Sequence, residues 1–280
     1  MITMLSDFGS KDSYVAVMKG AIAQIAPGIP TCDLTHEVPP QNILAARFNL
    51  LMAYPYFPKG TVHLAVVDPG VGSDRRASAL QSPSGFFVGP DNGLFSGVGD
   101  REPLLAAVSL TNPDYWRVPT PSVTFHGRDI FAPIAAHLAN GVPIATLGDH
   151  IEPSSLVKPN LPPFATSHPK KDNAKLAHYA GCFQYIDGFG NLITNIPARV
   201  VADGSWQLII CASHQSAESQ ERRKFAGVKT YGDVPMGEMA ALVGSHGWVE
   251  LACNGDSAAI ALKDIATLGT EIKIICTQII

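Results

Sequence analysis

The stretch Thr61–Arg76, TVHLAVVDPGVGSDRR, decides the fold expected for this chain. Its first half is an apolar run broken by one histidine, which is typical of a strand buried on both faces of a parallel sheet. Pro69 has a fixed φ and no backbone N–H, so the strand is predicted to end at Asp68. A carboxylate at a strand end, followed by glycines and two arginines, lies where open α/β sheets bind ligands. An ordinary strand end with a β-turn and a surface ion pair explains the segment equally well.

The segments on either side of this strand alternate between strand and helix patterns. Short apolar runs predict strands at Ile2–Leu5 and Thr31–Leu34. Apolar residues at helical spacing predict helices at Asp12–Ala26 and Asn42–Tyr54. The alternation predicts an α/β N-terminal domain with a mostly parallel sheet flanked by helices.

Other polar side chains also lie where a predicted strand ends or a predicted helix begins. Asp7 follows the first strand, where it either caps the next helix or accepts hydrogen bonds from a ribose diol. His126 precedes a predicted helix at Ile130–Asn140, whose dipole favours a neutral histidine able to accept a proton. A structural loop histidine is the competing interpretation. Arg128 and Asp129 are predicted to pair locally.

The pattern changes after a proline-rich segment, which marks a domain boundary. Residues 161–174 are predicted to link an N-terminal domain, 1–160, to a smaller all-β, barrel-like C-terminal domain, 175–280. The polar segment Ser213–Lys224 is predicted to form a solvated loop or a short surface helix. The predicted C-terminal strands are Lys175–Tyr179, Phe183–Ile186, Trp206–Cys211, Met239–Val243, Trp248–Cys253 and Ile272–Cys276.

Composition excludes several classes of protein. The 280 residues are 46% hydrophobic with a net charge of −4, which argues against disorder, nucleic-acid binding and anionic membranes. No apolar run approaches the ~20 residues of a membrane span, and no signal-peptide pattern is present. The five scattered cysteines predict free thiols in the cytoplasm. His36 and Glu37 lack companion ligands at a familiar spacing, so no metal site is predicted.

These residues together predict a small polar ligand such as a nucleoside, and six motifs narrow the expectation. The six are SDFG (Ser6–Gly9), VDPGVGSDRR (Val67–Arg76), GPDNG (Gly89–Gly93), FHGRDIF (Phe125–Phe131), DGFGNLITN (Asp187–Asn195) and NGDSAA (Asn254–Ala259). Taken together, these motifs resemble the S-adenosyl-L-methionine (SAM) hydroxide adenosyltransferases, or SAM hydrolases, which are related to the fluorinase and chlorinase.

The resemblance implies hydrolysis of SAM to adenosine and L-methionine, by in-line attack of an activated water or hydroxide on ribose C5′, without a metal or cofactor. The family's catalytic aspartate, arginine and histidine match Asp68, Arg75 and His126, and only the family spacing selects Arg75 over Arg76. The halogenating relatives carry aromatic residues in place of this aspartate and this histidine. The presence of Asp68 and His126 therefore points to hydrolysis.

The resemblance also implies how the substrate is held. Asp7 matches the carboxylate that binds the ribose diol, and Asn191 matches an adenine contact. Asp187 and Ser245 match groups that hold the methionine part. The family's assembly is a homotrimer, with SAM bound between the N-terminal domain of one subunit and the C-terminal domain of its neighbour.

Two other functions stay open at the level of sequence. A non-catalytic SAM- or adenosine-binding protein requires only Asp7, Asp187 and Asn191. A halide-dependent adenosyl transferase is disfavoured by Asp68 and His126.

Overall fold

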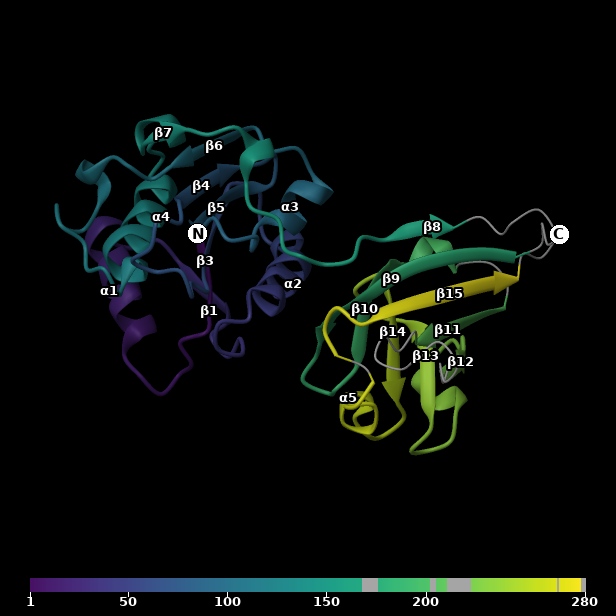
Figure 1. Ribbon diagram of the computed structural model, residues 1–280. Helices are drawn as coiled ribbons and strands as arrows, with labels where there is room; N and C mark the ends of the chain where they lie inside the picture. Colours follow the sequence, from purple (N-terminus) through teal and green to yellow (C-terminus); the bar gives the residue numbers. More distant parts are fainter. Residues whose placement is uncertain (168–175, 202–204, 211–222, 266, 278–280) are drawn as a thin grey trace. The chain divides into compact units, whose positions relative to one another are not determined.

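The computed structural model describes residues 1–167, 176–201, 205–210, 223–265 and 267–277. The chain divides into two compact units, Met1–Pro159 and Asn160–Ile280, called here the first and the second unit. Figure 1 shows helices packed around a sheet in the first unit and a strongly bent sheet in the second. Among the described residues, no helix has the length and apolar content needed to cross a membrane.

A seven-stranded sheet forms the centre of the first unit, in the order β2-β1-β3-β5-β4-β6-β7. Alternate residues of β1 and β3 bury their side chains on the face that α1 and α4 cover. The strands are β1 (Ile2–Ser6), β2 (Thr31–Thr35), β3 (Thr61–Val66), β4 (Ala77–Gln81), β5 (Gly85–Pro90), β6 (Ala106–Ser109) and β7 (Asp149–His150).

The prediction of a mostly parallel sheet is not confirmed, because the sheet is mixed. Strands β2, β1, β3 and β5 run parallel to one another, whereas the pairs β5–β4, β4–β6 and β6–β7 are antiparallel. The cause lies in the short turn between β4 and β5, where the Ser82 N–H donates to Gly85 O at 2.9 Å. A turn this short reverses the chain, whereas a parallel pair needs a long crossover.

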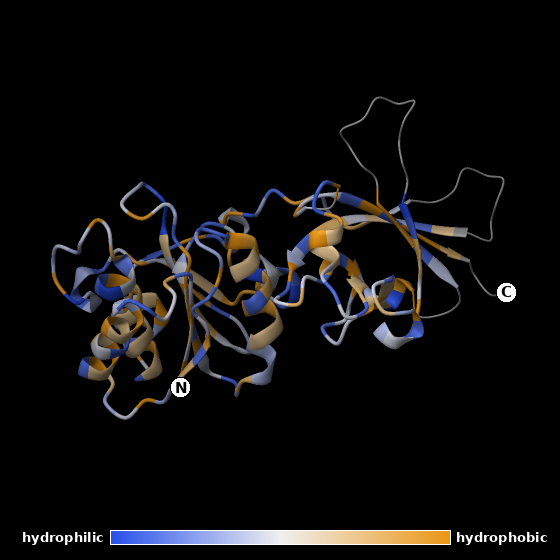
Figure 2. Ribbon diagram, turned by 90° about the horizontal axis from the view of Figure 1, so that it is seen from below, coloured by the Kyte–Doolittle hydropathy of each residue, from blue (hydrophilic) through white to orange (hydrophobic). Residues whose placement is uncertain are grey.

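Helices cover both faces of the sheet (Figure 1). α1 (Tyr14–Ile25) and α4 (Ala132–Ala139) lie on one face, and α2 (Ile43–Ala53) and α3 (Ser96–Arg101) lie on the other. Figure 2 shows that these helices carry both apolar and polar residues, as expected for helices with one buried face. A π-helical turn, Gly127–Phe131, precedes α4, so helical structure begins directly after His126.

His63 is the one polar side chain in the middle of β3, and it lies in the core at 1% exposure. Thr3 Oγ1 and His63 Nδ1 are 2.7 Å apart, and the imidazole stacks on Phe87 with ring centroids 5.0 Å apart. Burial lowers the pKa of His63 to about 4. The neutral ring therefore serves as a hydrogen-bonded core residue.

Acid is expected to destabilise the protein through His63. The unfolded chain protonates this ring near pH 6.5, whereas the folded chain does so near pH 4, so stability is complete above pH 6.5 and falls between the two values. The free energy of unfolding should lose about 3 kcal/mol across this window. Urea unfolding curves recorded at several pH values measure it, and His63→Gln should flatten the decline. An equally steep decline in the variant would contradict the assignment.

The second unit is a strongly curved antiparallel sheet, in the order β12-β11-β15-β9-β10-β14-β13, with β8 paired to β9. The Val228 N–H donates to Ala241 O at 2.8 Å, which links the segment after β12 to β13 and nearly closes the sheet. The barrel-like prediction is confirmed. The strands are β8 (Ala165–Ser167), β9 (Leu176–Ile186), β10 (Leu192–Pro197), β11 (Trp206–Ile210), β12 (Arg223–Ala226), β13 (Met239–Val243), β14 (Trp248–Cys253) and β15 (Glu271–Thr277), with a short helix α5 (Ala258–Ala261).

Several boundaries differ from those predicted. The two apolar runs around Gly181 belong to the single strand β9, because a glycine does not end a strand whose backbone stays paired with β15. β10 was not predicted as a strand. The described part of the predicted linker contains β8, which belongs to the second unit. Residues 168–174 and most of Ser213–Lys224 lie outside the described residues, but Arg223 and Lys224 begin β12.

Candidate functional site

The carboxylate of Asp68, directly after β3, is held by Arg75. Arg75 Nε donates to Asp68 Oδ1 at 2.9 Å and to Oδ2 at 3.1 Å, and Nη2 donates to Oδ2 at 2.5 Å. Both side chains are about nine-tenths buried, at 7% and 10% exposure. The Arg75 guanidinium also lies over the Phe131 ring, 5.3 Å from its centroid. This packing fixes the direction in which the carboxylate points.

The same guanidinium reaches His126. Arg75 Nη2 lies 2.7 Å from His126 Nδ1. Arginine has donors only, so Nδ1 accepts this hydrogen bond and the neutral ring carries its proton on Nε2. Burial and the neighbouring charge of Arg75 lower the pKa of His126, while Asp68 and Asp129 oppose the shift. Burial and Arg75 therefore favour the neutral histidine that the sequence predicts.

Asp68 and His126 line a cavity of about 330 Å³ together with Asp7. Asp7 Oδ2 accepts a hydrogen bond from the Gln41 backbone N–H at 2.8 Å. Gln41 has φ of 63°, a left-handed conformation that is uncommon outside glycine, and it also lines the cavity. Asp7 therefore faces the cavity rather than capping α1, for which no side-chain cap forms.

Arg75 and Arg76 have separate partners, which distinguishes them in a way that local sequence does not. Arg76 Nε donates to Asp91 Oδ2 at 2.8 Å, and its Nη1 donates to Ser155 Oγ at 3.0 Å. Asp91 Oδ1 accepts from the Val157 N–H at 2.9 Å. Arg76 and Asp91 thereby anchor the segment around residues 155–157, while Arg75 alone contacts Asp68.

Arg128 and Asp129 pair locally, as predicted. Arg128 donates two hydrogen bonds of 2.7 Å to Asp129, and Arg117 Nε donates another at 2.5 Å. Burial by itself raises the pKa of Asp129, but the hydrogen bonds from Arg128, the Ser122 N–H and Arg117 lower it well below its usual range. Asp129 is therefore a structural ion that ties the loop before α4 to the helix.

Asp187 and Asn191 lie together in the β9–β10 turn of the second unit. Asp187 Oδ1 accepts from the backbone N–H groups of Phe189 and Asn191, both at 2.9 Å. Asn191 Nδ2 donates to Asp187 Oδ2 at 2.9 Å. Asn191 and the exposed Phe189 line a second cavity, of about 560 Å³. Ser245 is exposed in the turn between β13 and β14 and lines neither of the two cavities.

The predicted residues therefore form two groups. Asp7, Asp68, Arg75 and His126 meet in the first unit, and Asp187 and Asn191 meet in the second. Sequence analysis missed aromatic side chains beside the first group: the Phe8 and Phe125 rings lie 5.7 Å apart, and both line the first cavity. Because Phe8 directly follows Asp7 and Phe125 directly precedes His126, the sequence already placed both rings beside predicted site residues.

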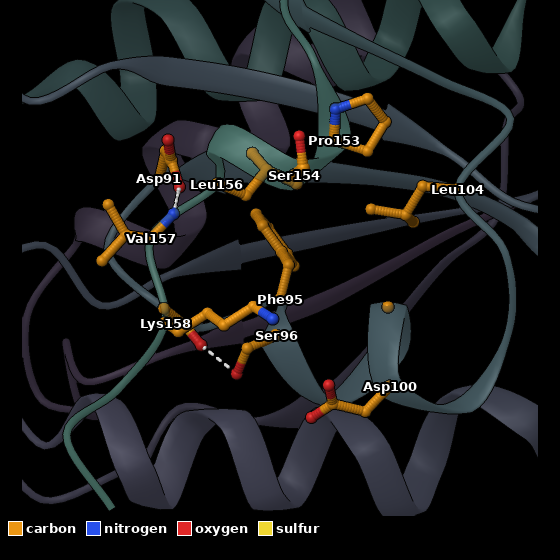
Figure 3. A pocket seen from close by; sticks show the side chains of 12 residues that line it. Asp91, Phe95, Ser96, Asp100, Leu104, Pro153, Ser154, Leu156, Val157 and Lys158 are labelled. Carbon is orange, nitrogen blue, oxygen red and sulfur yellow. Dashed lines mark hydrogen bonds between the residues drawn. The ribbon is translucent and has the colours of Figure 1, made fainter.

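A third cavity, of about 220 Å³, lies in the first unit against α3 (Figure 3). Its walls include the apolar side chains of Phe95, Leu104 and Leu156. Both of its carboxylates are already paired: Asp91 with Arg76 and the Val157 N–H, and Asp100 with Arg47 at 3.3 Å. This cavity holds no arrangement comparable to the contacts among Asp68, Arg75 and His126.

Comparison with known proteins gives consistent matches along the chain. Family models described as the SAM hydroxide adenosyltransferase N-terminal and C-terminal domains match residues 2–148 and 181–266. A protein of Salinispora tropica named (R)-S-adenosyl-L-methionine hydrolase is 40% identical over 92% of each chain. A protein of the same name from Thermus thermophilus is 39% identical over 94% of this chain and 96% of its own.

A more distant relative and a solved structure also match the chain over most of its length. A fluorinase of Actinopolyspora mzabensis is 28% identical over 92% of each chain. Among solved structures, a conserved protein of Thermotoga maritima superposes with a TM-score of 0.82 at 34% identity, covering 98% of this chain and 100% of that one.

Proposed function

Because this chain belongs to the SAM hydroxide adenosyltransferase family, we propose that it hydrolyses S-adenosyl-L-methionine to adenosine and L-methionine. The observation that carries the proposal is the contact of Arg75 with both Asp68 and His126 beside the first cavity. Water is a weak nucleophile, so the reaction needs groups that orient it and take its proton. The sulfonium is already an activated leaving group, so neither a metal nor a general acid is required.

The geometry assigns different roles to the three side chains. His126 Nδ1 is occupied by Arg75, so the ring acts through its Nε2–H as a hydrogen-bond donor to the attacking oxygen. Asp68 Oδ1 accepts one Arg75 hydrogen bond, whereas Oδ2 accepts two, which leaves Oδ1 the oxygen better able to take a proton. Arg75 holds both partners in place.

The water oxygen forms a bond to ribose C5′ while the C5′–sulfur bond breaks, and the sulfur keeps that electron pair to become the neutral thioether of methionine. The water proton passes to Asp68 and then to solvent. Holding the water in line with the departing sulfur removes much of the entropic part of the barrier.

The remaining side chains are proposed to bind the substrate. Asp7 accepts hydrogen bonds from the ribose diol in the first cavity, Asn191 contacts the adenine, and Asp187 and Ser245 hold the methionine part. The hydrogen bond from Gln41 supports the role of Asp7, since it leaves Asp7 Oδ1 for the substrate. We also propose that the protein acts in the cytoplasm.

One experiment tests the reaction against its alternatives. The purified protein is incubated with SAM and excess chloride in ¹⁸O-labelled water, and the products are analysed by mass spectrometry. Adenosine carrying ¹⁸O at the 5′ position, formed faster than without protein, is the expected product. 5′-Chloroadenosine would indicate a halide-dependent transferase instead. SAM binding without turnover would leave a binding protein and refute the catalytic roles.

The proposed assembly is a homotrimer in which SAM binds between the first unit of one copy and the second unit of the next. The division of the substrate-binding side chains between two units supports it. Light scattering should therefore give a mass of three chains. Co-expressed Asp68→Asn and Asp187→Ala subunits should be more active together than either is alone, because mixed trimers contain sites with both side chains intact. A monomeric mass, or no gain in activity, would contradict this assembly.

A further inference from the structure

A buried carboxylate in the second unit joins two loops, one of which lines the second cavity. Glu250, on β14, is 2% exposed. Tyr231 Oη donates to Glu250 Oε1 at 2.6 Å, and His246 Nε2 lies 2.8 Å from Glu250 Oε2. Tyr231 also lines the second cavity beside Asn191, and His246 directly follows Ser245.

Each partner is fixed in its role as a hydrogen-bond donor. The backbone N–H of Trp248 donates to His246 Nδ1 at 3.2 Å, so a neutral His246 carries its proton on Nε2 and donates it to Glu250. Burial and the charge of Glu250 raise the pKa of Tyr231, which keeps the phenol protonated and able to donate. The three side chains thus form a satisfied network around one carboxylate.

Stability alone does not account for this arrangement. A buried carboxylate loses its hydration, and well-packed apolar side chains of similar volume often stabilise a fold as well or better. The network also restricts its surroundings: a Cβ at Gly244 would collide with Glu250 Oε2 and His246 Nε2. The carboxylate fixes the positions of Tyr231 and His246 relative to each other, because each of its two oxygens binds one of them. These two residues are 15 positions apart in the sequence.

We propose that Glu250 is a positioning residue that holds Tyr231 at the wall of the second cavity and His246, with Ser245 beside it, at the neighbouring turn. The inference rests on the proposed function, since the cavity is taken to receive part of SAM. Glu250 acts only through its partners and is too buried to contact the substrate. Losing it should therefore weaken substrate binding and leave the chemistry at Asp68 unchanged.

Two variants test the proposal. Glu250→Gln keeps the shape but retains only one acceptor oxygen, so one of the two partners loses its acceptor. We expect the KM for SAM to rise about tenfold while kcat stays within about threefold of wild type. Tyr231→Phe removes the hydroxyl while the ring and the Glu250–His246 contact remain, and should raise KM by a smaller factor. In the double variant the two effects should be less than additive, since Tyr231 and Glu250 belong to one hydrogen-bonded network.

Glu102→Gln is the matched control. Glu102 accepts hydrogen bonds from Ser82 Oγ and Ser84 Oγ, at 2.9 and 2.8 Å, and lines none of the three cavities. Its loss should lower the Tm and leave KM unchanged. Folded Glu250→Gln and Tyr231→Phe proteins with a wild-type KM would overturn the inference. The proposed function would still hold in that case, provided that the wild-type protein hydrolyses SAM. A wild-type protein that neither binds nor hydrolyses SAM would overturn the proposed function itself.

Discussion

Replacing Asp68 with asparagine is expected to lower the kcat for SAM hydrolysis by roughly 10²–10⁴-fold, the usual contribution of a general base. Asparagine has the same shape and can still accept a hydrogen bond from Arg75, but it cannot take a proton. SAM binding should change little, because the proposed binding contacts come from other side chains. Adenosine formation followed by chromatography gives kcat, and calorimetry gives the affinity for SAM.

Asp91→Asn is the matched control for this variant. Asp91 is also a buried aspartate paired with an arginine near a strand end, with Arg76 Nη2 2.6 Å from Oδ2. Its replacement should lower the Tm while kcat stays near wild type, because Asp91 lies outside the first cavity. If Asp68→Asn kept a wild-type kcat, another group would have to take the water proton.

Replacing His126 with glutamine is expected to cost far less activity than replacing it with leucine. A glutamine amide can accept from Arg75 and donate to the attacking oxygen, as the neutral imidazole does, but it cannot act as a base. We expect a loss of up to about tenfold in kcat for His126→Gln and of about 10²–10³-fold for His126→Leu. Steady-state kinetics at saturating SAM measure both, and equal large losses would instead make His126 the proton acceptor.

The pH dependence of the same variants provides a second readout. Protonation of His126 would place an N–H on Nδ1, opposite the Arg75 donor, and would break that contact. Burial and Arg75 lower the pKa of His126, against Asp68 and Asp129, so activity should stay constant down to about pH 6.5 and fall only at lower pH. His126→Gln should lose this acid limb. In the wild-type protein, ¹H–¹⁵N spectra of the histidine ring should detect the proton on Nε2, and a proton on Nδ1 would refute the assignment.

The sequence by itself determined the places where chemistry can occur. Apolar runs that end at Asp7 and Asp68, and a glycine-containing loop before a helix at His126, report local backbone conformation and burial, which nearby residues dictate. The ordered motifs then identified the family. The same local signals gave the turn at Asp187–Asn191, where the side-chain hydrogen bonds of Asp187 lie within five residues.

Only the tertiary structure decided which groups face one another. Arg75 and Arg76 are adjacent in sequence, but one meets Asp68 and the other meets Asp91. The proton position on His126 follows from a contact with a residue 51 positions away. The pairing of β6 with β7 and the link of Glu250 to Tyr231 likewise depend on contacts between segments that are distant in sequence. Local patterns specify backbone shape and burial, whereas side-chain partners across the fold are specified by packing.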